Sequence, residues 1–398
     1  MLNTDFSPWP SFSRAEAEAV ANVLLSNKVN YWTGDECRKF EKEFADFFDS
    51  KYAIAVSNGT TALELAFIAM GVGKGDEVIV TSRTYFASVS SIVKVGATPV
   101  FADVSLTTQN ITAESIEQVL TSKTTAILCV HLSGWPCDMD PIMELAEAHD
   151  LAVIEDCAQA HGAKYKGRSV GSIGHIGAWS FCQDKIMTTG GEGGMVTTNE
   201  HDLWSRMWSY KDHGKSWDAV YKREHQQGFR WLHESFGTNW RMTEMQAAIG
   251  RIQLLHMKEW NASRVANANK IWSAAKECVG LRIPKSSCDV CSHRFGESAG
   301  CVHGAYKCYV FVDGTENDRN VLMNEINNFG VPCFVGTCSE VYLEKAFANS
   351  GLLPEKRLPN AKTLAETSLM FLCHPNLTDK EISKTCDVIE TTVTKYFK

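Results

Sequence analysis

The chain has 398 residues, of which 44% are hydrophobic, and a formal net charge of -8. That length allows a sizeable core and favours two domains over one, and the acidic balance without a basic stripe argues against nucleic acid as a partner. The beginning of the chain lacks a basic region followed by an apolar one, and no apolar run is long enough to cross a bilayer, so we expect a cytoplasmic protein without membrane contact.

Strand-like and helical segments alternate from residue 53 to about residue 198. Helical spacing places Leu63, Ala66, Phe67 and Met70 on one face. Continuous apolar strands separated by helices indicate a largely parallel sheet that is buried on both faces, which is an α/β layer architecture. The predicted strands are residues 53–56, 77–80, 98–104, 126–132, 152–157, 177–181 and 195–198.

The character of the sequence changes after residue 241. Residues 241–275 contain no Pro and no Gly except Gly250, which predicts a long helix or a helix pair that leaves the large domain. From about residue 281 a smaller region follows, with a strand at 307–312, a helix near 318–329 and a final helix from about 379. We therefore predict a large domain over residues 1–260 and a small α+β domain over residues 261–398.

The stretch "SNGTT", residues 57–61, lies between a predicted strand and a predicted helix. Ligands in open α/β sheets bind beyond the carboxyl ends of the strands. Gly59 permits close approach of the backbone, and free amides at a helix N-terminus suit a phosphate. The alternative is a turn that only caps the helix.

Asp156 follows an apolar strand in "VIEDCAQAHG". A carboxylate at such a position is partly buried and needs a partner. It is either the N-cap of a helix or an anion that faces a ring nitrogen and keeps it protonated.

Lys185 lies in "SFCQDKIMTTGGEGG", between a strand-like segment and a glycine-rich turn. Glycines permit unusual dihedral angles and close packing around a flat ligand. A lysine with apolar or cationic neighbours loses its proton more readily and can form a Schiff base. The alternative is a lysine that caps a β-hairpin.

A phosphate cradle, a carboxylate for a ring nitrogen and a Schiff-base lysine are together what pyridoxal phosphate requires. Nearly the whole chain also resembles the DegT/DnrJ/EryC1/StrS family of sugar aminotransferases, within the fold type I superfamily of pyridoxal phosphate enzymes. The resemblance rests on "YWTGDECRKFEKEFADFF", "SNGTTALELAFIAMGVGKGDEVIV", "GATPVFADV", "VHLSGWPCDMD", "VIEDCAQAHGAKYKGRSVGSIG", "SFCQDKIMTTGGEGGMVTTN" and "TNWRMTEMQAAIGRIQL".

The resemblance implies a role for each matching residue. Lys185 is similar to the Schiff-base lysine and Asp156 to the partner of the pyridine nitrogen. Tyr85 matches an aromatic that stacks on the cofactor, and Gln159 a glutamine beside its phenolic oxygen. The residues that the resemblance assigns to the phosphate are Gly59, Thr60, Thr61 and Ser180, together with Asn239 acting on the neighbouring subunit of a homodimer.

The implied reaction moves an amino group from L-glutamate to a nucleotide-linked keto sugar for surface polysaccharide or glycoconjugate biosynthesis. Carbon 4 of a 4-keto-6-deoxyhexose is the first expectation and carbon 3 the alternative. Relatives that dehydrate sugars carry histidine in place of the lysine, so Lys185 favours transamination. Tyr31, Trp32 and His213 are candidate substrate contacts.

Two other classes of function are alternatives. The chain could be a non-catalytic relative that binds the cofactor or a nucleotide sugar, but the intact Lys185 and Asp156 argue against lost catalysis. A nicotinamide-dependent sugar oxidoreductase needs a glycine fingerprint after its first strand, which "SNGTTALE" lacks.

The sequence departs from the family in three places. "TTGGEGG" has one extra Gly, Ser133 stands where a tyrosine is common, and a segment rich in Cys and His is inserted at residues 288–303. Cys-x-x-Cys with later Cys and His can bind zinc, but the spacing in the second half is loose. We therefore favour a surface insertion without a metal. The alternative is a zinc site formed by Cys288, Cys291, His293, Cys301 and His303.

Overall fold

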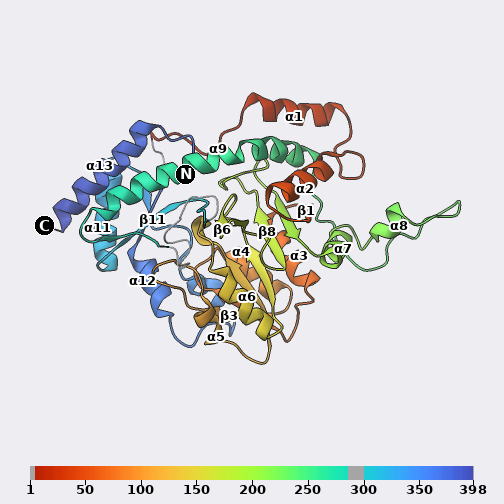
Figure 1. Cartoon of the computed structure of the whole chain (residues 1–398), viewed down its shortest axis with the longest axis horizontal. Coiled ribbons are helices and arrows are strands. Elements are labelled where there is room, and N and C mark those ends of the chain that lie inside the picture. Colours follow the sequence, from red (N-terminus) through yellow and green to blue (C-terminus); the bar gives the residue numbers. More distant parts are fainter. Residues whose placement is uncertain (1–4, 286–299, 398) are drawn as a thin grey trace.

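A seven-stranded sheet forms the centre of the larger part of the chain (Figure 1). The computed structural model describes residues 5–285 and 300–397. The strand order is β1-β9-β8-β5-β4-β2-β3. β9 is antiparallel to both of its neighbours, and the other strands point the same way as one another. The strands are β1 (Tyr52–Val56), β2 (Glu77–Thr81), β3 (Thr98–Ala102), β4 (Thr124–Val130), β5 (Ala152–Asp156), β8 (Ile176–Ser180) and β9 (Gly194–Thr198).

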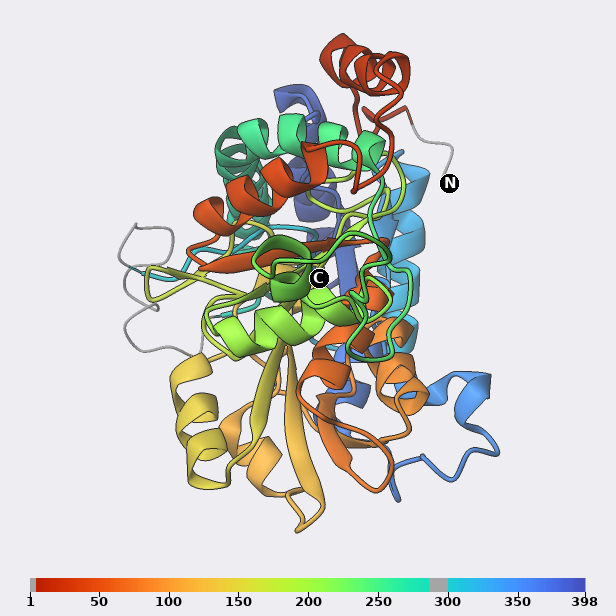
Figure 2. The same ribbon diagram turned by 90° about the vertical axis from the view of Figure 1, so that its right-hand side faces the viewer.

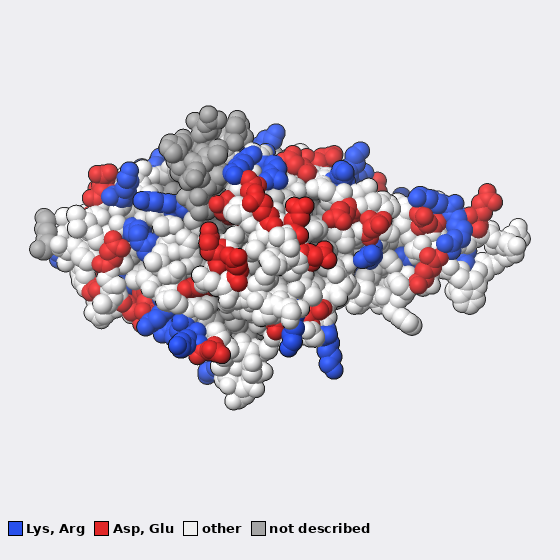
Figure 3. All heavy atoms as spheres, turned by 60° about the horizontal axis from the view of Figure 1, so that its bottom comes forward, with Lys and Arg blue, Asp and Glu red and all other residues white. Residues whose placement is uncertain are grey.

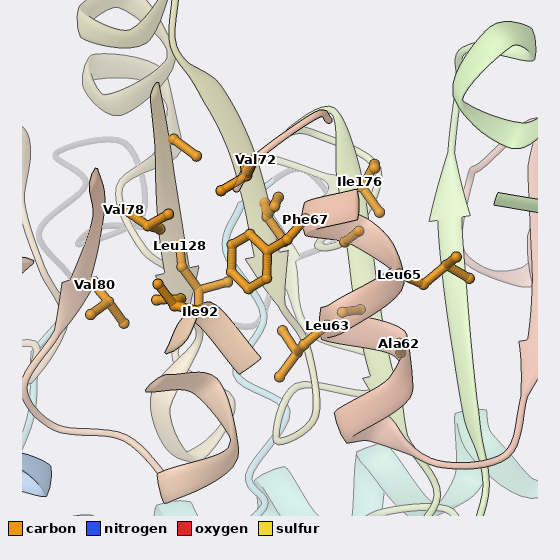
Figure 4. Packing of buried hydrophobic residues seen from close by; sticks show 14 of the residues in the cluster. Ala62, Leu63, Leu65, Phe67, Val72, Val78, Val80, Ile92, Leu128 and Ile176 are labelled. Carbon is orange, nitrogen blue, oxygen red and sulfur yellow. The ribbon is translucent and has the colours of Figure 1, made fainter. Parts of the chain in front are cut away.

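Helices cover both faces of this sheet, which confirms the predicted α/β architecture. Val78 and Val80 of β2 face a core formed with α3, α4 and α7, whereas Ile79 faces the opposite core, formed with α5 and α6. Figure 4 shows Phe67 of α3 pointing toward Leu128 of β4. Because both faces are buried, the strands are continuous apolar runs. The helices in this part are α1 (Arg14–Leu25), α2 (Glu36–Phe47), α3 (Gly59–Ala69), α4 (Phe86–Lys94), α5 (Ala113–Glu117), α6 (Met139–Ala148), α7 (His201–Tyr210) and α8 (Trp217–Tyr221), with a 3-10 helix η1 (Leu132–Gly134).

A second, smaller sheet has the order β10-β11-β13-β12 and is antiparallel throughout. Its core packs against the last helices of the chain, so this region is α+β as predicted. The remaining elements are β6 (Lys164–Tyr165), β7 (Arg168–Ser169), β10 (Leu281–Arg282), β11 (Cys308–Val312), β12 (Cys333–Phe334), β13 (Ser368–Phe371), η2 (Val341–Leu343), η3 (Lys345–Phe347), α11 (Glu316–Asn328), α12 (Pro359–Thr367) and α13 (Asp379–Tyr396).

The segment predicted as a long helix or a helix pair is one helix of 33 residues, α9 (Glu244–Lys276). A capping box starts it, in which Thr243 and Gln246 bond each other's backbone N–H groups. Its first half, to Met257, packs in a core with α2, and its second half, from Ala268, packs with the small sheet. The predicted domain boundary near residue 260 falls between these halves and stays a prediction.

Figure 2 shows α1 lying outside α9, on the edge of the molecule farthest from α5 and α6. The segment that carries α8 projects from the end of the molecule that lies opposite the C-terminus (Figure 1). On the face drawn in Figure 3 acidic and basic side chains are interspersed. Among the described helices, none combines the length and the apolar composition that a membrane crossing needs.

Candidate active site

A cavity of about 380 Å³ opens at the edge of the large sheet where β1, β2, β5 and β8 end. Parallel strands place their carboxyl ends on one edge, which is where open α/β sheets bind ligands. The structure therefore brings together residues that are far apart in the sequence. The residues predicted for the cofactor that line this cavity are Gly59, Thr60, Tyr85, Asp156, Gln159, Ser180 and Lys185.

The register of β9 brings the turn after β1 close to the end of β8. Gly194 pairs with Val56 on one side and with Ser180 on the other. A Cβ atom on Gly194 would lie 2.4 Å from the carbonyl oxygen of Asn58, and one on Gly59 would lie 2.6 Å from the Cβ of Ser180. Only glycine at both positions allows this close approach.

The N-terminus of α3 faces the cavity across this junction. The Asn58 side chain accepts a hydrogen bond from the Thr61 N–H at 2.9 Å, and the Thr61 hydroxyl donates to the Asn58 carbonyl oxygen at 2.8 Å. Thr61 is thus part of the helix cap and does not line the cavity. The N–H groups of Gly59 and Thr60 have no acceptor within the helix. With the Ser180 hydroxyl they form a cradle suited to a phosphate.

Asp156 ends β5 and is only 5% exposed. Its Oδ1 accepts a hydrogen bond from the Ala158 N–H at 3.0 Å, and its Oδ2 accepts one from the Ser88 hydroxyl at 2.7 Å. Ser88 in turn lies 2.7 Å from the Thr84 hydroxyl. These bonds satisfy the buried carboxylate and fix its orientation at the wall of the cavity.

Glu155, the neighbour of Asp156, anchors the loop on the other side of β5. Its carboxylate accepts hydrogen bonds from the N–H groups of Gly171 at 2.8 Å and Gly174 at 2.7 Å, and it lies 2.9 Å from Nε2 of His131. Burial acts to raise the pKa of Glu155, but His131 and the backbone N–H groups outweigh it and hold that pKa below its ordinary value. This network holds the end of β5, and with it Asp156, in a rigid setting.

Lys185 lies in the connection between β8 and β9, which are antiparallel neighbours. The lysine is thus in a hairpin, as the alternative interpretation held, and its side chain also lines the cavity. Its N–H donates to the Cys182 carbonyl oxygen at 3.1 Å. Gly190 and Gly191 have φ values of 88° and 126°, which residues with a side chain rarely adopt. The extra glycine therefore serves the turn that returns the chain to β9.

Three further charged or aromatic groups surround Lys185. Its Nζ lies 5.1 Å from the ring centroid of Tyr306, and the Nζ of Lys307 lies 4.7 Å from the same centroid. The Tyr306 hydroxyl donates to Oδ2 of Asp184. Burial and the nearby Asp184 raise the pKa of Tyr306 well above its ordinary value, so the phenol stays protonated and acts as a donor.

Tyr85 and Gln159 both line the cavity. Tyr85 precedes α4 and is 61% exposed, so its ring is available to a flat ligand. Gln159 accepts a hydrogen bond from the Ser133 N–H at 2.8 Å and donates to Sγ of Cys338 at 3.4 Å. Ser133 also donates through its hydroxyl to the Lys307 carbonyl oxygen at 2.6 Å. The backbone of residue 133 thus orients Gln159, whereas the serine hydroxyl bonds the chain at Lys307.

Asn239 and His213 lie outside this cavity. Both are exposed and lie on two adjacent segments of the chain. Asp212 forms an isolated β-bridge with Asn239, and the N–H of His213, which is in a turn, donates to the Thr238 carbonyl oxygen at 3.0 Å. The predicted role of Asn239 concerns a neighbouring subunit, so its exposure is compatible with that prediction.

Tyr31 and Trp32 also lie outside the cavity. Tyr31 is 1% exposed, its hydroxyl donates to Glu41 at 3.2 Å, and the Nζ of the buried Lys211 lies 3.5 Å from its ring centroid. Trp32 has the Nζ of Lys215 4.0 Å from its ring. In this chain taken alone, both aromatics are occupied by internal cation–π contacts.

The predicted insertion falls mostly outside the described residues, which omit Cys288, Cys291 and His293. Cys301 and His303 are described and buried. His303 accepts a hydrogen bond from the Ala305 N–H through Nδ1, and burial lowers its pKa to about 3. The expected surface insertion and the zinc alternative both stay predictions.

Several residues of the cavity were not predicted from the sequence. Asp184 directly precedes Lys185, and this adjacency could have identified it. Ser88 lies in α4, and nothing in the sequence of that helix distinguishes it from its neighbours. Tyr306 and Thr337 come from the smaller region, and only the packing of the two regions brings them to the site. The cavity-lining residues that were missed include Thr84, Ser88, Asp184, Glu192, Tyr306 and Thr337.

Comparison with known proteins agrees with this geometry. A model of the DegT/DnrJ/EryC1/StrS aminotransferase family matches residues 10–390. The chain belongs to this family. An aminotransferase from Psychrobacter cryohalolentis, known from an X-ray structure, is 62% identical in sequence to this chain, with a TM-score of 0.93 over 99% of this chain and 100% of that one.

Two curated relatives carry more detailed names. The GDP-perosamine synthase of Escherichia coli O157:H7 is 47% identical, and the match covers 62% of this chain and 64% of that protein, just under two thirds of its length. The dTDP-3-amino-3,4,6-trideoxy-alpha-D-glucose transaminase of Streptomyces venezuelae is 34% identical over 94% of this chain and 92% of that protein. The members that resemble this chain are thus named for amino sugars on two different nucleotides.

Proposed function

We propose that this member of the family is a pyridoxal phosphate-dependent aminotransferase that transfers the amino group of L-glutamate to a nucleotide-linked keto sugar. The observation that carries the proposal is the convergence of Lys185, Asp156 and the Gly59–Ser180 junction on one cavity. A binding protein without catalysis would need the cradle but not the lysine. Family membership supports the same reaction class.

The cavity fits the cofactor in each of its parts. The first-turn N–H groups of α3 and the Ser180 hydroxyl are donors for the phosphate, at a place where a Cβ on Gly59 would intrude. Asp156 is a buried carboxylate for the ring nitrogen, and Tyr85 offers an exposed ring for the pyridine face. When bound, pyridoxal phosphate supplies an electron-accepting ring that stabilises negative charge on the carbon next to the transferred nitrogen.

The chain's own groups have separate tasks in this proposal. Lys185 Nζ would hold the cofactor and, once freed, would take a proton from the α-carbon of the donor and deliver it to the carbon on the other side of the transferred nitrogen, acting as base and acid. Asp156 would keep a proton on the ring nitrogen, and the bonds from Ser88 and Ala158 hold its carboxylate in a fixed orientation for that role. Gln159, held by Ser133, donates beside the phenolic oxygen.

The proposal includes carbon 4 of a 4-keto-6-deoxyhexose as the acceptor. The relative named for a 3-amino sugar is 34% identical to this chain, whereas the GDP-perosamine synthase is 47% identical. This ranking does not favour carbon 3. Asn239 completes the phosphate site of a second copy in a homodimer, and Tyr31, Trp32 and His213 remain proposed substrate contacts of that assembly.

The decisive experiment is the visible absorption spectrum of the cofactor-loaded protein before and after L-glutamate is added. We expect a yellow band that is replaced by the spectrum of pyridoxamine phosphate, and we expect Lys185→Ala to abolish the change. Lys94→Ala is the control, because Lys94 lies on the surface and pairs with Glu64 at 3.1 Å. A protein that stays colourless with added cofactor would refute the proposal.

The acceptor is tested separately. The glutamate-treated protein is incubated with a nucleotide-linked 4-keto-6-deoxyhexose and, in parallel, with a 3-keto isomer. NMR of the product identifies the carbon that carries nitrogen. Turnover of the 3-keto sugar alone would move the proposal to carbon 3 and leave the reaction class intact.

A further inference from the structure

The N-terminal segment before α1 crosses the molecule and contacts the Lys185 turn. The indole Nε1 of Trp9 donates a hydrogen bond to the carbonyl oxygen of Lys185 at 2.8 Å, across 176 positions of the chain. Lys185 therefore presents its side chain to the cavity while its carbonyl group is held from the other side. Neither the phosphate cradle nor Asp156 takes part in this bond.

Trp9 is itself held by residues of the second half of the chain. Its ring meets Trp260 of α9 edge-on at 5.2 Å and stacks on His374 at 5.9 Å. The guanidinium carbon of the buried Arg264 lies 4.7 Å from the Trp9 ring centroid. An indole fixed on three sides cannot follow a moving turn, so its N–H imposes one position on the Lys185 carbonyl.

The two residues before Trp9 are tied to the C-terminal region. The Ser7 hydroxyl donates to Glu381 at 3.1 Å, beside the first turn of α13, and the Asn376 side chain donates to the Pro8 carbonyl oxygen at 3.0 Å. The segment thus forms a strap, residues 7–9, that runs from the C-terminal region to the Lys185 turn.

We infer that Trp9 is a positioning residue for Lys185, and that the strap of residues 7–9 links the conformation of the C-terminal region to the placement of the Lys185 amine. The inference rests on the proposed function for its consequence in catalysis, but its structural part concerns the protein without cofactor. A proton transfer over a fixed distance depends on where the amine is held. A turn that gains freedom slows that transfer without changing the binding of the sugar.

The test uses Trp9→Phe, which keeps an aromatic ring against Trp260, His374 and Arg264 and removes only the N–H donor. Trp260→Phe is the matched control, because it removes an indole N–H from the same aromatic group without taking a donor from the Lys185 carbonyl. Asn376→Ala releases the strap at its other end, by removing a half-buried side chain that donates to the Pro8 carbonyl oxygen.

The first readout is hydrogen–deuterium exchange of the cofactor-free protein in peptides that cover residues 181–190. The amides of Lys185 and Thr189 are protected there by bonds to Cys182 and Phe181. We expect Trp9→Phe to speed their exchange about fivefold, the factor for one neutral hydrogen bond, Asn376→Ala to speed it less, and Trp260→Phe to leave it unchanged. Unchanged exchange in Trp9→Phe overturns the inference. If exchange in Trp9→Phe rises over the whole protein, the Asn376→Ala variant decides. In Asn376→Ala, faster exchange confined to residues 181–190 supports the strap, and unchanged exchange in those residues overturns it.

The second readout is the glutamate half-reaction of the cofactor-loaded protein. We expect Trp9→Phe to lower its maximal rate about five- to tenfold, while the glutamate concentration for half-maximal rate stays the same. A change in that concentration alone would assign Trp9 to binding and overturn the positioning role. If no variant, wild type included, reacts with glutamate, the proposed function fails while the exchange result still decides whether Trp9 holds the turn.

Discussion

Replacing Gly59 with Ala tests the geometry on which the phosphate cradle depends. The added Cβ would lie 2.6 Å from the Ser180 Cβ, 3.0 Å from its hydroxyl oxygen and 3.2 Å from its Cα. Two of these contacts cannot be relieved by a rotamer change, because they involve the Cα and Cβ of Ser180. The end of β8 or the first turn of α3 must therefore move.

Overpacking of this kind costs about 1–3 kcal/mol in folding free energy. A shift of a few tenths of an ångström also spreads the donors of the cradle, so we expect the dissociation constant for pyridoxal phosphate to rise at least tenfold. Urea unfolding of the cofactor-free protein, at one fixed protein concentration, measures the first effect. Titration with the cofactor, followed by visible absorption, measures the second.

The matched control is Gly73→Ala, because a Cβ at Gly73 would meet only the Val95 carbonyl oxygen, at 3.8 Å, which is ordinary contact. This variant should stay within about 0.5 kcal/mol of the wild type and bind the cofactor normally. If Gly59→Ala proves as stable as Gly73→Ala and binds the cofactor equally well, the close approach of α3 to β8 does not shape the site.

Three further predictions concern the carboxylate, its support and the response to acid. Asp156→Asn removes the charge that keeps the ring nitrogen protonated, so the glutamate half-reaction should slow about 10²- to 10³-fold in stopped-flow absorption; a loss below threefold would contradict that role. Ser88→Ala removes the 2.7 Å bond to Asp156, and about a threefold to tenfold loss of the same rate is expected, with Ser90→Ala, whose hydroxyl bonds the Ala87 carbonyl oxygen instead, as control. Burial and the charges of Lys185 and Arg264 lower the pKa of His161 from 6.5 to about 3. The unfolded chain therefore binds a proton at pH 5 that the folded chain does not, and His161 should cost up to about 2 kcal/mol of stability between pH 7 and pH 5. His161→Phe should remove that share of the slope in urea unfolding series, and an unchanged slope would show that His161 does not titrate in this way.

The strands of the large sheet were predictable because burial on both faces leaves a simple signal. "AILCVHL" and "AVIEDC" are largely apolar runs. β4 overlaps the first run, and β5 lies within the second. The helical character of α9 followed from residues 241–275, which lack Pro and nearly lack Gly, but the sequence left one long helix and a helix pair as alternatives. α1 and α2 were not predicted; α1 packs on α9, and α2 packs on both α9 and β1.

The cavity was predictable where one turn carries one function, as at Gly59, Asp156 and Lys185. It was not predictable where two regions meet. Tyr306 lies over Lys185 only because the small sheet docks beside the hairpin of β8 and β9, and no local pattern records that docking. Tyr31 is another such case. It begins the conspicuous "YWTG", but its hydrogen bond to Glu41 and its cation–π contact with Lys211 depend on packing that the sequence alone does not reveal.

The pairing of Gly194 with both Val56 and Ser180 has a consequence for how the protein is made. β1 leaves the ribosome early, but the strand that pairs with it in the sheet is β9, whose residues are synthesised about 140 positions later. Joining such distant segments is slow, because a long loop must close before any pairing forms. The nascent chain thus has no phosphate cradle until β9 emerges. A ligand that binds this cradle would recognise, and stabilise by mass action, only chains in which the edge of the sheet has closed.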